Sequence, residues 1–122
     1  MTYQRSQRVA ELLHQEISRM VQFELKDPRL GFVTITGVDV TADVQFARIY
    51  YTVVGDDEAR RNSTRALEKS IGFIRRQLGR RLHMRTIPEI AFKYDESLDR
   101  GNRIEELLRS LHEEEADDQG HR

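Results

Sequence analysis

A two-sided helical segment is encoded by residues 58–85, EARRNSTRALEKSIGFIRRQLGRRLHMR. At about 100° per residue on a 3.6-residue helix, one side collects five apolar residues: Leu67, Ile71, Ile74, Leu78 and Leu82. Roughly opposite lie five basic residues: Arg61, Arg65, Lys69, Arg76 and Arg80. The pattern predicts a helix that packs on a core with one face and presents positive charge with the other.

The charge of this segment is hidden in the composition of the whole chain. Residues 58–85 hold nine Lys or Arg against two acids, a balance of +7, whereas the chain carries −1. The other 94 residues hold 11 basic and 19 acidic residues, a balance of −8. Concentrated positive charge on one element is typical of polyanion-binding proteins. Because nine to two is more lopsided than a mixed-charge surface, we favour nucleic-acid binding over an ordinary solvated helix face.

Gly72 lies on the basic side of this helix, between Lys69 and Arg76. A glycine inside a helix costs roughly 0.5–1 kcal/mol relative to alanine, so its presence requires a reason. Two reasons stay open. The glycine permits a kink, after which the restarted helix offers free N–H groups to a phosphate. Alternatively, another element packs closely against it.

The neighbouring segments indicate a helix, a hairpin and a further strand. Apolar residues at helical spacing predict a helix from the expected N-cap Ser6 to about Leu25. Residues 33–40 and 46–54 alternate as strands, with a β-bulge expected at Gly37, and their short link predicts an antiparallel hairpin. Asp57 is the expected cap of the basic helix, which should end around Met84. Residues 90–94 alternate as a third strand, so we predict a two-layer α+β domain with helices on one face of a three-stranded sheet.

The C-terminal end and the composition complete the organisation. A short helix is expected over residues 104–111, within a domain of residues 1–112, and residues 113–122 are expected to be a disordered acidic tail. The chain has no cysteine and no apolar run near the roughly 20 residues of a membrane span. We therefore expect a cytoplasmic protein without a membrane partner.

Several short strings along the chain carry a family resemblance. They are Arg8-Val9-Ala10, Asp27-Pro28-Arg29-Leu30-Gly31, Phe46-Ala47-Arg48-Ile49-Tyr50-Tyr51, Gly72-Phe73-Ile74-Arg75, Ile87-Pro88-Glu89-Ile90-Ala91-Phe92, and Asp95 with Ser97 and Gly101. In this order they resemble the bacterial ribosome-binding factor A family. The resemblance runs from about Arg5 to Leu111. It is also a resemblance of element order, because α-β-β-α-kink-α-β is the order of a type II KH-like domain, an RNA-binding fold.

The resemblance implies a function in ribosome assembly. Family members bind the immature small (30S) ribosomal subunit and its 16S rRNA, and they assist late rRNA folding and processing, notably in the cold. They are not enzymes and need no cofactor. The resemblance further implies a monomer off the ribosome that works beside other assembly factors, including GTPases.

The same resemblance singles out the residues at the helix kink. The family lacks the Gly-x-x-Gly loop of other KH domains and carries instead a kink commonly written Ala-x-Gly. The matching triplet here is Ser70-Ile71-Gly72. Serine bonds readily to nearby backbone and tolerates a helix break, so we expect the kink to be kept.

These observations together give a candidate RNA site. Phosphate contacts are expected from Arg61, Arg65, Lys69, Arg76 and Arg80. Gly72 would let the RNA backbone approach closely, with Arg75 and Arg81 flanking its path. Phe73, at the edge of the basic side, is the best candidate for stacking on a base, with packing into the core as the alternative.

Two other functions are weighed against RNA binding. One is a protein–protein adaptor that docks its basic helix on an acidic partner. The other is a metal-dependent ribonuclease that uses the acidic loop residues Asp95, Glu96 and Asp99. Acids in such a turn-rich loop more often fix turns, and the four histidines have no metal-ligand spacing, so we predict no metal site and no enzymatic activity.

Overall fold

The computed structural model describes residues 2–97. Along the chain the elements are α1 (Thr2–Phe23), β1 (Val33–Val40), β2 (Phe46–Val53), α2 (Asp57–Lys69), α3 (Ile71–Leu82) and β3 (Glu89–Tyr94). This is the element order predicted from the sequence. The helix expected over residues 104–111 and the acidic tail over 113–122 lie outside the described residues.

The three strands form one sheet in the order β1-β2-β3. Strands β1 and β2 pair as the predicted antiparallel hairpin, and β3 lies parallel to β2. The register shifts between Ile35 and Gly37, which leaves Thr36 as the extra residue of the predicted bulge. The Thr36 hydroxyl donates to Asp95 Oδ2 at 2.6 Å. The bulge therefore links β1 to the chain that follows β3.

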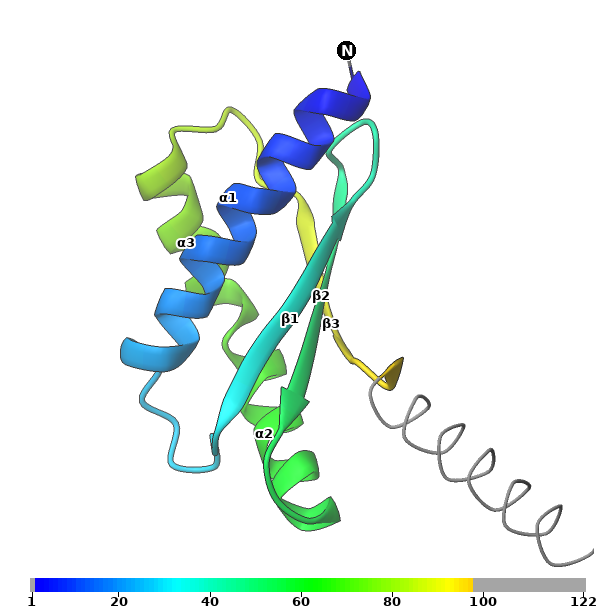
Figure 1. Cartoon of the computed structure of the whole chain (residues 1–122). Coiled ribbons are helices and arrows are strands. Elements are labelled where there is room, and N and C mark those ends of the chain that lie inside the picture. Colours follow the sequence, from blue (N-terminus) through cyan, green and yellow to red (C-terminus); the bar gives the residue numbers. More distant parts are fainter. Residues whose placement is uncertain (1, 98–122) are drawn as a thin grey trace, which may run out of the picture.

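All three helices lie on one face of the sheet (Figure 1). On β2 the alternation is as predicted, because Ala47, Ile49 and Tyr51 are buried whereas Phe46 and Arg48 are exposed. The helices contribute the opposite half of the core through buried apolar residues: Val9, Leu13, Ile17, Met20 and Val21 of α1, Leu67 of α2, and Ile74 and Leu78 of α3. The helical spacing thus indicated the buried Leu67, Ile74 and Leu78, and it missed Ala66, which is fully buried on α2.

Two predicted helix caps are wrong. Helix α1 begins at Thr2, so Ser6 lies inside it, buried with 5% of its surface exposed. Ser6 lies one turn before Val9 on the core side, where a small residue fits. At α2 the N-cap is Asp56, whose side chain accepts from Ala59 N at 2.9 Å. Asp57 is the first residue of the helix, where a negative charge still favours the helix dipole.

The other end of the basic segment lies close to its predicted position. Helix α3 ends at Leu82, about a half-turn before Met84, and His83 terminates it in the left-handed conformation with φ 51° and ψ 33°. Within residues 2–97 no helix combines the length and the apolar character needed to cross a bilayer.

Candidate nucleic-acid interface

The helix break predicted at Ser70-Ile71-Gly72 is present, and it falls at Ser70. Helices α2 and α3 are joined end to end by this single residue (Figure 1). The Ser70 N–H donates to Ala66 O at 3.1 Å and to Leu67 O at 3.0 Å, and its hydroxyl also donates to Ala66 O, at 2.8 Å. Because the hydroxyl is directed back to α2, it does not cap α3. The first turn of α3, which contains Gly72, therefore begins without a side-chain cap.

The predicted basic residues lie on the outer side of this helix pair. We call them the basic face; all five are exposed, and they are Arg61, Arg65 and Lys69 on α2 with Arg76 and Arg80 on α3. Within residues 2–97 none of the five forms a hydrogen bond or an ion pair. Their charges are consequently available to a ligand.

Gly72 lies on the surface beside the basic face. A Cβ built at Gly72 would have as its nearest neighbour Arg76 Nη1, at 3.5 Å, which is ordinary van der Waals contact. No other element within the described part of the chain approaches the position closely enough to require glycine. Of the two reasons left open for Gly72, close packing of an element is therefore not the one observed.

Arg75 was predicted to flank the RNA path, but its side chain is engaged inside the protein. Its Nη2 donates to Ile87 O at 2.9 Å and its Nε donates to Pro88 O at 3.2 Å. These bonds attach α3 to the segment that leads into β3. A guanidinium that satisfies two backbone carbonyls has fewer donors left for a phosphate.

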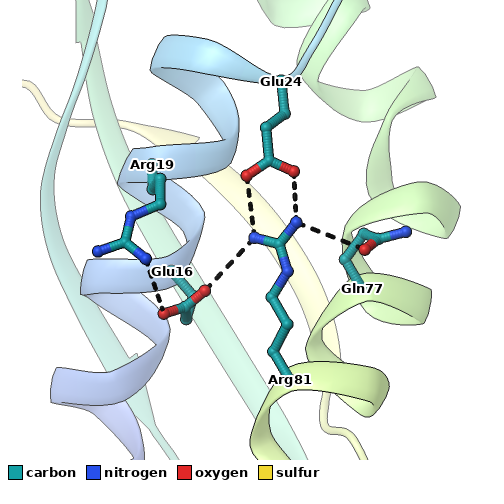
Figure 2. Close-up of polar contacts among 5 residues, drawn as sticks. All are labelled: Glu16, Arg19, Glu24, Gln77 and Arg81. Atoms are coloured by element: carbon teal, nitrogen blue, oxygen red, sulfur yellow. Dashed lines mark hydrogen bonds and ion pairs between the residues drawn. The ribbon is translucent and has the colours of Figure 1, made fainter.

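Arg81, the other predicted flanking residue, lies in an ion-pair cluster between α3 and α1 (Figure 2). Its Nη1 donates to Glu24 Oε2 at 3.0 Å and to Glu16 Oε1 at 3.4 Å, and its Nη2 bonds the other Glu24 oxygen. Arg19 forms a second, longer pair with Glu16 at 3.8 Å. The hydrogen bond from Arg81 holds the pKa of Glu24 below its ordinary value. Arg81 thus stabilises the packing of α3 on α1.

Phe73, the predicted stacking residue, is partly buried and packs against the hydrophobic core. A ring that contacts the core on one side offers less of its surface to a base. The placement fits the core alternative stated for Phe73 and leaves the basic face without an aromatic residue of its own.

A hollow of about 520 Å³ beside α2 was not predicted. At its edge Arg60 Cζ lies 3.5 Å from the centre of the Tyr94 ring, and Arg60 also pairs with Glu96 at 3.8 Å. The sequence analysis included Arg60 in the positive charge of residues 58–85 but assigned it no role. One feature of the sequence could have indicated the contact: Arg60 lies about 100° around the helix from Arg61, toward the sheet, and the third strand carries an aromatic residue there, Tyr94.

The acidic loop gives no support to metal-dependent cleavage. Asp95 Oδ2 accepts from the Thr36 hydroxyl and Oδ1 accepts from Ser97 N at 2.9 Å. Hydrogen bonds from Ser97 and Thr36 lower the pKa of Asp95. Glu96 pairs with Arg60, Asp99 lies outside the described residues, and no group of three His, Asp or Glu able to hold a metal occurs over residues 2–97. The described acids fix a turn.

The family model described as ribosome-binding factor A matches residues 5–108 of this chain. Curated relatives of that name agree over nearly their whole length. The protein of Geobacter sulfurreducens is 48% identical over 116 residues, which are 95% of this chain and 98% of the relative. That of Desulfitobacterium hafniense strain DCB-2 is 47% identical over 120 residues, which are 98% of this chain and 96% of the relative.

Solved structures agree with the fold. The crystal structure of ribosome-binding factor A from Thermus thermophilus matches with a TM-score of 0.65 and 25% identity, over 73% of this chain and 93% of that one. A solution structure from Thermotoga maritima, a putative ribosome binding factor A, matches with 0.61 and 30% identity, over 73% and 89%. A Thermus thermophilus homology model fitted into the cryo-EM map of a 30S complex matches with 0.60 and 25% identity, over 71% and 91%.

Proposed function

The chain belongs to the ribosome-binding factor A family, and from this premise we propose that it binds the small ribosomal subunit through its basic face. The relative fitted into the map of a 30S complex supports the choice of partner. One observation carries the choice of surface: five exposed cations lie along α2 and α3, and none forms a hydrogen bond or an ion pair in the described part of the chain. Concentrated unpaired positive charge suits a phosphate backbone.

The geometry of the basic face suits a backbone contact. Arg61, Arg65 and Lys69 recur at four-residue intervals on α2, and a rise of 1.5 Å per residue spaces them about 6 Å apart along the axis. Arg76 and Arg80 repeat the interval on α3. Gly72 leaves the surface open between the two sets, so the RNA backbone can approach the first turn of α3, where helical N–H groups favour phosphate.

The role that we propose is assembly rather than catalysis. The protein would bind the 16S rRNA of the immature subunit, assist its late folding and processing, and matter most in the cold, where misfolded RNA is slow to rearrange. Phosphate contacts position a protein but do not specify a sequence, so selection of the immature particle would come from the shape of the RNA. We further propose that it is cytoplasmic, monomeric off the ribosome and assisted by other assembly factors, including GTPases.

The test is binding to purified precursor particles, mature small subunits and protein-free 16S rRNA, measured by co-sedimentation at several salt concentrations. We expect the chain to sediment with precursor particles and to bind the free rRNA with an affinity that falls steeply with salt. Protein-dependent crosslinks on the rRNA should map to one region in precursor particles. Binding to particles without any binding to free rRNA contradicts the proposal and favours the adaptor that docks on an acidic protein.

A further inference from the structure

A second surface lies next to the basic face but differs from it in chemistry. It is the hollow of about 520 Å³ beside α2, which is lined by residues of α2, β2 and the end of β3. Tyr51 of β2 is buried, and its hydroxyl forms a hydrogen bond with the hydroxyl of Thr64 on α2. Tyr94 of β3 meets Tyr51 edge to face, with ring centres 5.6 Å apart. The hollow thus has an aromatic wall and polar hydroxyls within it.

The charges around this hollow are mixed. Arg60, Arg61 and Arg65 line it together with the carboxylates of Asp57 and Glu68. The two acids offset two of the three arginines, so the hollow is close to neutral and suits a phosphate less than the basic face does, to which Arg61 and Arg65 also belong. A neutral group with hydrogen-bond donors on its edge suits the interior better, because carboxylates and hydroxyls accept such bonds. A nucleobase with exocyclic amino groups has this chemistry.

Arg60 provides a flat platform at the edge of the hollow. Its Cζ lies 3.5 Å from the centre of the Tyr94 ring, which is the separation of a cation–π stack. The ion pair with Glu96 restrains the same guanidinium, and 39% of the side chain stays exposed. One side of the guanidinium is therefore covered by Tyr94, and the exposed part is available to a base, which stacks on guanidinium planes as well as on aromatic rings.

We propose that this hollow is a subsite for one unpaired nucleotide of the bound RNA. The base stacks on Arg60, which Tyr94 supports, with its edge toward the acids and hydroxyls, while the adjoining phosphates contact Arg61 and Arg65. The subsite rests on the proposed RNA-binding function and deepens it, because a flipped-out base is a feature by which a protein distinguishes single-stranded loops from duplex RNA.

The test compares two RNA strands that differ only in their bases. One is a single-stranded oligoribonucleotide of about ten nucleotides, and the other has the same length and charge but abasic riboses. The unmodified chain should bind the base-bearing strand about tenfold more tightly, because stacking of a base on a protein side chain contributes on that scale. In Arg60→Lys, which keeps the charge but loses the flat platform, the preference should largely vanish while the dependence on salt stays unchanged.

Arg19→Lys is the matched control, because Arg19 is an exposed arginine on α1 that also pairs with a glutamate. It should keep the full preference, and melting curves should show both variants folded. In the unmodified chain, light-induced crosslinks from 4-thiouridine in the RNA should fall on the peptides that hold Arg60 or Tyr94. Equal binding of both strands by the unmodified chain, or a preference that survives in Arg60→Lys, overturns the subsite and leaves the proposed function standing. Failure to bind either strand also overturns the subsite, and the proposed function is then decided by the co-sedimentation with precursor particles and free 16S rRNA.

Discussion

Helix α3 carries two pairs of arginines that differ in exposure and in bonding partners. Arg76 and Arg80, the outer pair, are exposed and have no hydrogen bond or ion pair within residues 2–97. Arg75 and Arg81, the inner pair and their immediate neighbours in sequence, bond respectively to the carbonyls before β3 and to Glu24, which directly follows α1. Position around the helix axis therefore decides the role: a turn of about 100° takes an arginine from the solvent side to a side with internal acceptors.

The comparison also shows why the count of basic residues overstated the candidate site. The +7 balance of residues 58–85 includes charge that is neutralised inside the fold, as Glu24 and Glu16 neutralise Arg81. What remains for a polyanion is the basic face and the exposed Arg85 beyond the end of α3. Substitutions in the two pairs should consequently change different quantities. Substitution of the outer pair should change RNA affinity and its dependence on salt, whereas substitution of the inner pair should change the melting temperature and its dependence on pH.

The largest expected effect is on the outer pair. Arg76→Glu combined with Arg80→Glu should weaken RNA binding by at least roughly 25-fold near 0.1 M salt, since each lost phosphate contact forfeits the release of about 0.7 counterion. The slope of log affinity against log salt should become shallower by about 1.4. Filter binding over a salt series measures both quantities.

The matched control reverses the same number of charges elsewhere. Arg5→Glu combined with Arg8→Glu alters two exposed arginines of α1, so the net charge changes equally. This variant should keep the salt slope of the unmodified chain. Equal loss of affinity in both double variants would mean that net charge, and not the basic face, governs binding.

Substitution in the inner pair should lower stability and leave RNA binding nearly unchanged. Arg81→Gln removes the partner of Glu24 and the nearer of the two partners of Glu16, and it should lower the melting temperature by a few degrees at neutral pH. RNA affinity should change little. The hydrogen bond from Arg81 holds the folded pKa of Glu24 below its unfolded value, so the stabilisation is complete above roughly pH 4.3 and is lost as pH falls through the folded pKa.

Thermal unfolding of Arg81→Gln and the unmodified chain at pH 7 and at successively lower pH tests this assignment. The difference in melting temperature should narrow below roughly pH 4.3. A variant that melts normally but binds RNA poorly would place Arg81 in the interface after all.

The sequence predicted correctly those features that depend on a single helix or strand. The spacing of Leu67, Ile74 and Leu78 predicted the buried side of α2 and α3, and the phase change at Gly37 predicted the bulge. Both are periodicities of a single strand or helix, so no knowledge of the neighbouring element was needed.

The sequence was a poor guide wherever two distant elements meet. The pairing of Arg81 with Glu24 requires that α3 lie beside α1 in one register, and the stack of Arg60 on Tyr94 requires that α2 lie over the end of β3. The spacing of residues within one helix or strand does not predict how it aligns with another element. The predicted cap of α2 was wrong for a smaller reason: Asp56 and Asp57 are adjacent and both able to cap a helix, and only the backbone geometry at Asp56 decides between them.

An ion pair in the turn after α1, between Arg29 and Asp27, also has its charges satisfied within the protein. Asp27 accepts three bonds from Arg29: from the backbone N–H at 2.9 Å, from Nε at 3.1 Å and from Nη2 at 2.8 Å. The side-chain bonds from Arg29 lower the pKa of Asp27 to about 2. Asp27→Asn keeps an acceptor for the turn but loses the charge.

The stability that the ionised Asp27 contributes should be complete above the unfolded pKa of roughly 3.9 and should fade as pH falls toward about 2. Urea unfolding of both chains near about pH 5 and about pH 2.5 should show a small gap that narrows at the lower pH. Because 38% of the Arg29 side chain is exposed, added salt should also shrink the gap. A gap of equal size at both pH values contradicts the assignment.

The smallest expected effect is the most specific to the basic face. Gly72→Ala places a methyl group 3.5 Å from Arg76 Nη1, and the backbone at Gly72 does not have the positive φ that penalises alanine. The variant should therefore be as stable as the unmodified chain or more stable by up to roughly 0.5–1 kcal/mol. Co-sedimentation with the small subunit should nevertheless weaken by a few-fold, because the methyl group occupies the space through which an RNA backbone would approach α3.

Gly55→Ala is the contrasting variant for this last prediction. Gly55 has φ +131°, and a Cβ there would lie 2.8 Å from the Cβ of Ala59, so alanine should cost stability at that position. Gly55 lies outside the basic face, so the folded fraction of that variant should still bind RNA with the normal salt slope. The two glycines thus separate the effects: one substitution should change binding without loss of stability, and the other should change stability without loss of binding.

Gly72→Ala with higher stability and unchanged particle binding would contradict the prediction. It would show that the open backbone at Gly72 contributes nothing to RNA contact, and the basic face would then act through its side-chain charges alone.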